Sequence, residues 1–163
     1  MSPPAKPGDY SGEFNVTAMK VTEPAGAFGP TTIIPRNQAF TLSTEFNIDG
    51  WIGKGLNDLP PLGAPVFEYN VTYYAESMGP GIDYKFPPGP ASVTHTIACI
   101  KGQYAYNAAQ SSYTVPANTM QEGEYKLTCR VKMSPVTGPG GAGGFPWHVL
   151  GFVEGPTIEI YIP

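Results

Sequence analysis

The chain has 163 residues and a formal net charge of −4, from 9 basic and 13 acidic side chains. Its 20 glycines and 19 prolines argue against a mainly helical protein, because these residues are the poorest helix formers. No surplus of basic side chains is present to neutralise phosphates, which argues against nucleic-acid binding. With 41% hydrophobic and 12% aromatic residues, the chain can bury a core as one domain.

The predicted elements begin after a polar, proline-rich segment. We expect residues 1–12 to form a flexible arm and residues 13–163 to form a single domain. No apolar segment is typical of a secretory signal peptide or long enough to span a membrane. We therefore expect the protein in the cytoplasm or in a particle or assembly, without membrane insertion.

Alternation of apolar and polar residues with a period of two, typical of half-buried strands, recurs along the chain. At its start Phe14, Val16 and Ala18 alternate, and Met19 and Val21 continue in the opposite phase, which predicts a β-bulge. No segment has the 3.6-residue period of an amphipathic helix. The remaining predicted strands, in chain order, are Ala39–Asp49, Val66–Tyr74, Ile82–Phe86, Ser92–Ile100, Gln103–Tyr106, Ser111–Val115, Glu124–Met133 and Pro156–Ile162.

Glycine and proline gather between the predicted strands. The main connections are Pro24–Pro35, Asp49–Pro65 and Ser134–Pro146, with a turn at Gly79–Gly81. Several short strands separated by such connections are typical of an all-β antiparallel sandwich. We expect about seven to nine strands with long Gly/Pro-rich loops.

One short motif adds a resemblance to a known superfold. In Glu122–Leu127, a glycine precedes Tyr125, and an inward-facing Leu127 follows two positions later. This motif resembles the approach to strand F of immunoglobulin-like domains, and the strand pattern of most of the chain resembles an immunoglobulin-like or fibronectin-III-like sandwich. The resemblance implies that the Tyr125 hydroxyl bonds to upstream backbone, as a tyrosine corner, and that Leu127 stands where the second conserved cysteine usually lies.

The two cysteines, Cys99 and Cys129, do not match the disulfide of that superfold. The partner cysteine expected in the earlier strand, around Phe40–Phe46, is absent. We expect two reduced, buried thiols, and a different bridge between Cys99 and Cys129 is the alternative.

Two long loops carry most of the candidate binding residues. In the implied topology, the last strand spans Leu150–Ile162. The loop between 39–49 and 66–74 then lies at the same end as the loop between 124–133 and this last strand. Both tryptophans of the chain lie in these loops, so we expect an aromatic contact surface at that end. Tyr74 is a further candidate, because it neighbours Tyr73 in one strand and only one of them can face the core. The candidate contact residues are Trp51, Ile52, Leu56, Tyr74, Phe145, Trp147 and His148.

Few residues are suited to catalysis. The two histidines are His95, expected on the inward face of a strand, and His148 in a loop. No spacing of histidines with carboxylates is typical of a metal site, and no serine lies in a nucleophile motif. We therefore expect no enzymatic activity, no metal and no cofactor.

These observations favour a non-enzymatic structural or assembly protein. Such a domain would pack against itself or against a larger protein scaffold, such as a shell, a filament or a virion decoration. The low share of charged residues, 13%, and the loop aromatics favour this interpretation. The alternative is a carbohydrate-binding or other ligand-recognition module that uses the loop aromatics. A second apolar layer beneath the long loops would also account for the aromatic residues.

Overall fold

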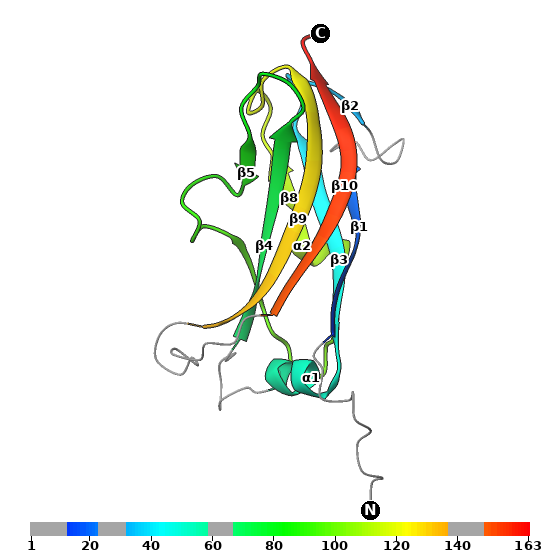
Figure 1. The fold of residues 1–163 in the computed structure, drawn as a ribbon, viewed down its shortest axis with the longest axis vertical. Coiled ribbons are helices and arrows are strands. Elements are labelled where there is room, and N and C mark those ends of the chain that lie inside the picture. The colour runs from blue at the N-terminus through cyan, green and yellow to red at the C-terminus, as the bar shows by residue number, and fades with distance from the viewer. Residues whose placement is uncertain (1–12, 23–31, 59–66, 137–148) are drawn as a thin grey trace, which may run out of the picture.

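The computed structural model is built almost entirely of strands, which confirms the all-β class (Figure 1). It describes residues 13–22, 32–58, 67–136 and 149–163, so the expected arm, residues 1–12, lies outside the described residues. The elements are β1 (Glu13–Thr22), β2 (Ile33–Pro35), β3 (Phe40–Asp49), α1 (Trp51–Asn57), β4 (Phe67–Ser77), β5 (Tyr84–Phe86), β6 (His95–Ala98), β7 (Ala105–Tyr106), α2 (Ala108–Ser111), β8 (Tyr113–Val115), β9 (Gly123–Pro135) and β10 (Val149–Tyr161).

The strands form two sheets that lie against each other (Figure 1). The four-stranded sheet has the order β1-β3-β7, with β8 also paired to β3. The six-stranded sheet has the order β2-β10-β9-β4-β5, with β6 also paired to β4. This arrangement places β3 and β4, which follow each other among the strands, in different sheets, so both sheets contribute to one core.

One pairing departs from the expected antiparallel sandwich. β2 pairs with β10 in parallel, so the six-stranded sheet is mixed, and the described residues form ten strands rather than seven to nine. The segment Pro24–Pro35 was expected to be a connection, but its last three residues pair with β10. Pro35 has no N–H to donate, and β2 accommodates it because it is at the edge of its sheet.

The core lies between the two sheets, and its composition follows the predicted alternation. The inward residues predicted for β3, β4 and β9 are all buried. Aromatic rings join the sheets, since the ring centroid of Phe46 on β3 lies 5.0 Å from that of Tyr69 on β4. The predicted strand Pro156–Ile162 runs one residue too far, because β10 ends at Tyr161 and Ile162 is 58% exposed.

The predicted β-bulge in the first strand is confirmed. The register between β1 and β3 shifts between Thr17 and Lys20. Ala18, inside this shift, has a positive φ of 49°, which places an extra residue in β1. The bulge turns Met19 and Val21 toward the core, where both are buried.

A helix occupies part of the segment Asp49–Pro65, which was expected to be a loop. Gly50 starts α1 with a φ of 76°, a conformation that favours glycine. The carboxylate of Asp49 accepts a hydrogen bond from the Gly50 N–H and lies 2.8 Å from the Lys54 ammonium. These contacts fix the first turn locally, so the helix forms although its sequence has no amphipathic period.

Tyr125 makes the hydrogen bond that the sequence motif predicts. Its hydroxyl donates to the backbone carbonyl of Gln121 over 3.2 Å, and its ring is fully buried. The ring also packs edge-on against Tyr84, with 5.7 Å between centroids. Two positions further along β9, Leu127 is buried in the core, as expected.

Strand β1 packs tightly against β10, which belongs to the other sheet. A Cβ added at Gly151 would overlap the side chains of Phe14 and Val16, and one at Gly155 would lie 2.5 Å from the Met19 sulfur. Glycine is therefore required at these inward positions of β10 because β1 side chains fill the space that a side chain would take.

We expect Gly151→Ala to lower the free energy of unfolding by about 1–3 kcal/mol, because the methyl group forces Phe14 or Val16 out of position. The matched control is Gly55→Ala in α1, where no atom lies within 4 Å of the added Cβ. That change raises stability by up to about 1 kcal/mol through helix propensity. Denaturant unfolding measures both, and equal stabilities for the two variants would contradict the close approach of β1 to β10.

Candidate interaction surface

The structure describes the predicted contact residues only in part. Phe145, Trp147 and His148 lie outside the described residues. Trp51 and Ile52 form the first turn of α1, at the end where β3 stops and β4 begins (Figure 1). The prediction that both tryptophans meet at this end therefore stays a prediction. Leu56 is partly buried and packs against the core, so it is part of the fold. Tyr74 is half-buried on the outward face of β4.

Below α1, a buried polar cluster holds the helix on the core. The side-chain oxygen of Asn57 accepts hydrogen bonds from the hydroxyls of Tyr69 (2.8 Å) and Tyr106 (3.0 Å). Its amide nitrogen donates to the carbonyl of Ile100 over 2.9 Å. All three side chains of this cluster are buried, so each polar group needs its partner inside the protein.

A second, more exposed group of contacts continues from this cluster. The Tyr104 hydroxyl donates to the Asp58 carboxylate, which also accepts from the Gly102 N–H over 2.9 Å. These bonds lower the pKa of Asp58, with the bond from Tyr104 as the largest cause. The Lys54 ammonium lies 5.2 Å from the centre of the Tyr104 ring. The described polar side chains at this end are thus engaged with one another and serve to hold α1.

We expect Asn57→Ala to lower the free energy of unfolding by about 2 kcal/mol or more, because it leaves the buried hydroxyls of Tyr69 and Tyr106 without an acceptor. The control is Asn47→Ala, which removes an amide from the outward face of β3 and costs less than about 0.5 kcal/mol. Thermal unfolding of both variants tests the expectation, and a cost for Asn57→Ala no larger than the control would refute this account of α1.

The two cysteines are free thiols, as expected, and the alternative of a disulfide is contradicted. The N–H of Cys99 donates to Phe67 at the start of β4, whereas Cys129 lies opposite Tyr73 further along that strand. Phe67 and Tyr73 are six residues apart on β4, which is about 20 Å in an extended strand. This distance is well beyond the span of a disulfide. Cys129 is buried and Cys99 is half-buried.

Burial is the largest cause that raises the pKa of Cys99 and of Cys129, each from an ordinary value of 9.0 to about 12. Burial also raises the pKa of Tyr69 and of Tyr73. The folded protein therefore favours the protonated forms of these groups, and neither thiol is activated as a nucleophile.

We expect stability to fall as the pH rises from 9 toward 12, because unfolding lets both thiols ionise at their ordinary pKa. A group whose pKa is raised by folding contributes its full stabilising free energy at pH values below its pKa in the unfolded chain. This contribution is lost as the pH rises toward its pKa in the folded protein. Denaturant unfolding across this range tests the sign. The variant Cys129→Ala removes one titrating thiol, so its loss of stability should be shallower, and an identical pH profile would contradict the assignment.

His95 is a structural strand residue, in agreement with the prediction. Its Nε2 donates to the carbonyl of Gln110 over 2.8 Å, which ties β6 to α2. The predicted strand Ser92–Ile100 is shorter than expected, since only His95–Ala98 pairs with β4 and Val93 is exposed. Among the described residues, no group of three or more histidine, cysteine or acidic side chains could hold a metal ion.

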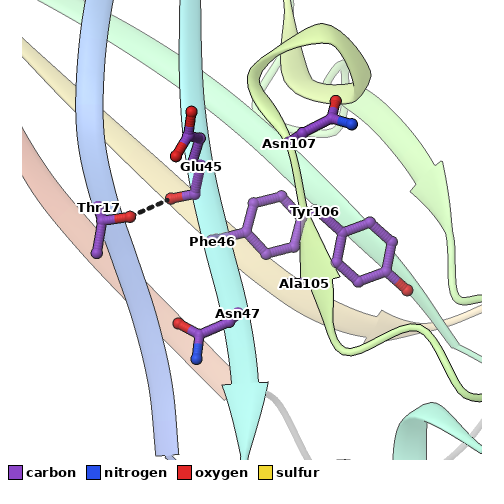
Figure 2. Close-up of a pocket in the computed structure, with 7 residues that line it drawn as sticks. All are labelled: Thr17, Glu45, Phe46, Asn47, Ala105, Tyr106 and Asn107. Carbon is purple, nitrogen blue, oxygen red and sulfur yellow. Dashed lines mark hydrogen bonds between the residues drawn. The ribbon is translucent and has the colours of Figure 1, made fainter.

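A shallow hollow of about 450 Å³ lies on the outward face of the four-stranded sheet (Figure 2). Its polar side chains are largely engaged: the Thr17 hydroxyl donates to the Glu45 carbonyl, and the Glu45 carboxylate lies 3.4 Å from the Lys20 ammonium. Asn107 caps α2. The two aromatic residues of the lining belong to the core and are buried. The hollow is lined by Thr17, Glu45, Phe46, Asn47, Ala105, Tyr106 and Asn107.

The outward face of the six-stranded sheet is different, because it exposes large apolar side chains. Phe152 is 66% exposed and Leu150 is 49% exposed, both on β10. In the β10–β9 register, Phe152 lies opposite Arg130, and Leu150 lies opposite Lys132. Each of these apolar side chains on β10 therefore lies beside a cationic side chain on β9. We call Leu150, Phe152, Arg130, Lys132 and Tyr74 the β10 face.

Arg130 forms the centre of the β10 face. Its guanidinium lies 5.7 Å from the centre of the Tyr74 ring, a cation–π distance. Within the described residues it forms no ion pair, and its Nε is buried without a hydrogen-bond partner. Arg130 pairs across the strands with Thr72, whose hydroxyl is likewise buried without a partner. This face thus combines a flat aromatic ring, an unpaired cation and two exposed apolar side chains.

Sequence reasoning missed most of the β10 face, although a signal was present. Clear alternation is recognised only from Pro156, whereas the last strand of the implied topology, Leu150–Ile162, agrees with β10 to within one residue at each end. The glycine at position 151 lies between two large apolar residues, Leu150 and Phe152. Because glycine faces the crowded core there, the period of two places Leu150 and Phe152 on the outside.

Comparisons with protein-family models, with curated proteins and with solved structures give no match for this chain. In the part of the chain that the structure describes, no helix is long and apolar enough to cross a membrane. The function is therefore argued from the residues of the surface.

Proposed function

We propose that this chain is a non-enzymatic protein-interaction domain with a structural or assembly role, and that the β10 face is its contact surface. The observation that carries the proposal is Phe152, a large aromatic side chain on β10 that is 66% exposed and lies opposite Arg130 of β9. Exposed apolar side chains that cluster, rather than scatter singly, are typical of interaction sites.

The residue types of the β10 face support a protein partner. Arginine and aromatic side chains supply much of the binding energy in protein interfaces, especially where they become fully desolvated. Arg130 is already held over Tyr74, so little side-chain entropy is lost when a partner covers it. The low charge of the chain also favours association, since charged residues make up only 13%.

An immunoglobulin-like arrangement is part of the proposal. If β3, β4, β9 and β10 correspond to strands B, C, F and G, then the observed pairing of β1 with β3 and the order β10-β9-β4 agree with the two sheets of that superfold. The hydrogen bond from Tyr125 to Gln121 supports the same assignment. Proteins of this superfold have many different functions, so the proposed function rests on the contact surface and not on the fold.

The structure offers less support for a carbohydrate-binding module. Sugar recognition uses exposed rings as stacking platforms, but Tyr74 is half-buried beneath Arg130. The hollow on the opposite sheet presents polar side chains that already have partners, together with the buried rings of Phe46 and Tyr106. We therefore place protein interaction ahead of carbohydrate binding.

Photo-crosslinking tests the proposed contact surface. A photoreactive phenylalanine analogue replaces Phe152 in the full chain, and irradiation in an extract of the producing cells is followed by identification of the crosslinked proteins. We expect defined protein adducts, either to a second copy or to another protein. The matched control carries the same analogue at Asn15, an exposed position on the outward face of the other sheet. Adducts at position 152 no stronger than at position 15 would contradict the proposed function.

A further inference from the structure

We infer that the partner of the β10 face is an acidic protein segment, which places one carboxylate over Arg130 and a second over Lys132. This inference rests on the proposed function and adds the chemistry of the partner. It follows from the positions of these two cations and of the carboxylates around them.

The two cations lie next to each other on the outward face of β9. Arg130 and Lys132 are two residues apart, so their side chains leave the same face about 7 Å apart along the strand. Among the described residues, no acidic side chain lies across from either of them on the neighbouring strands. Their cross-strand neighbours are Thr72 and Phe152 for Arg130, and Asn70 and Leu150 for Lys132. Two like charges at this separation repel each other, and carboxylates above them would relieve the repulsion.

Both cations are available to a partner. Within the described residues, neither takes part in a salt bridge, and the Arg130 Nε is buried without a hydrogen-bond partner. The Tyr74 ring, 5.7 Å from the guanidinium, holds Arg130 on the sheet but supplies no opposite charge. Both cationic side chains are half-buried. A carboxylate bound to them is therefore partly shielded from water, where bonds between charged groups are stronger than at a fully exposed site.

Carboxylates on the same face limit the length of the acidic segment. Glu68 on β4 lies at the level two residues beyond Lys132. Glu154 on β10 lies at the level two residues before Arg130, and it is paired with Lys126 at 3.0 Å. The basic region therefore spans only two levels of side chains. Because an extended segment turns alternate side chains to one face, two acidic residues separated by one residue match this region.

The same carboxylates make a long polyanion a poor partner. A nucleic acid or an anionic membrane presents phosphates beyond the two basic levels, and these would face Glu68 or Glu154. The net charge of the chain, −4, adds to this repulsion. A protein segment can instead carry two acidic residues with uncharged residues on either side. The charges of this face therefore favour a short acidic segment of a protein.

Phe152 and Leu150 supply the apolar part of the contact. Each lies directly across from one of the two cations, about 5 Å to the side on the neighbouring strand. A partner that places its acidic side chains over β9 covers both residues with the side chains next to them. We therefore expect aromatic or aliphatic residues beside the acidic pair. Because the contact is small and partly electrostatic, its binding should be reversible and weakened by salt.

Fluorescence anisotropy with a labelled peptide tests the inference, with the full chain titrated at low and at high salt. The probe is Gly-Phe-Glu-Ser-Glu-Phe-Gly, blocked at both ends, and its matched control is Gly-Phe-Gln-Ser-Gln-Phe-Gly. At low salt, we expect the acidic peptide to bind about tenfold more tightly than the neutral one, because two charge pairs form at half-buried cations. At high salt, most of this difference should be lost.

Charge reversal tests the two cations directly. Arg130→Glu and Lys132→Glu should each weaken binding of the acidic peptide by about tenfold, since each replaces an attraction by a repulsion. The double variant should prefer the peptide Gly-Phe-Lys-Ser-Lys-Phe-Gly, a reversal that an unfolded chain would not produce. The matched control is Lys20→Glu on the other sheet, where Lys20 contacts Glu45. This control should bind like the natural chain.

Several outcomes would overturn the inference: no binding of the acidic peptide, equal binding of the acidic and neutral peptides, or an unchanged preference in the double variant. A single-stranded deoxythymidine oligonucleotide that binds as tightly as the acidic peptide would also overturn it, in favour of a general polyanion site. In each case, crosslinks from position 152 to a protein would leave the proposed function intact. Crosslinks no stronger than those from position 15 would refute both.

Discussion

The packing of β1 against β10 is the constraint on which the rest of the structure depends. Phe14 and Val16 occupy the space beside Gly151, so β10 must turn this position inward. Because side chains of a strand alternate between faces, the same constraint turns Leu150 and Phe152 outward. A requirement of the core therefore exposes a large aromatic ring, and the candidate surface is a direct consequence of how the sheets pack.

The buried tyrosines impose a second requirement, because a phenol in the core needs a partner for its hydroxyl. Tyr73 donates to the carbonyl of Ser111 in α2, and Tyr125 donates to that of Gln121. Tyr69 and Tyr106 both donate to Asn57 in α1. The two short helices thus supply acceptors for buried hydroxyls, which explains why helical turns occur in a chain so rich in glycine and proline.

Local patterns predicted the parts of the fold that local physics determines. The alternation in β3 and β9, the bulge near Ala18 and the hydrogen bond of Tyr125 all depend on neighbours close in sequence. The helix α1 has local contacts from Asp49 but is held on the core by distant tyrosines, and the parallel pairing of β2 depends on β10, so apolar alternation predicts neither of them. The exposure of Phe152 had a local signal in Gly151, but the reason why this glycine faces inward lies in the distant residues Phe14 and Val16.

The small number of charges on this chain gives each of them more weight in recognition. Specificity is a difference between the right contact and the wrong ones, and a like-charge contact penalises the wrong ones. On the outward face of the six-stranded sheet, Arg130 and Lys132 lie opposite Phe152 and Leu150, and within the described residues neither cation forms a salt bridge. At the proposed contact surface, Phe152 and Leu150 would supply apolar attraction to a partner, while Arg130 and Lys132 beside them would favour a partner that places acidic groups over them.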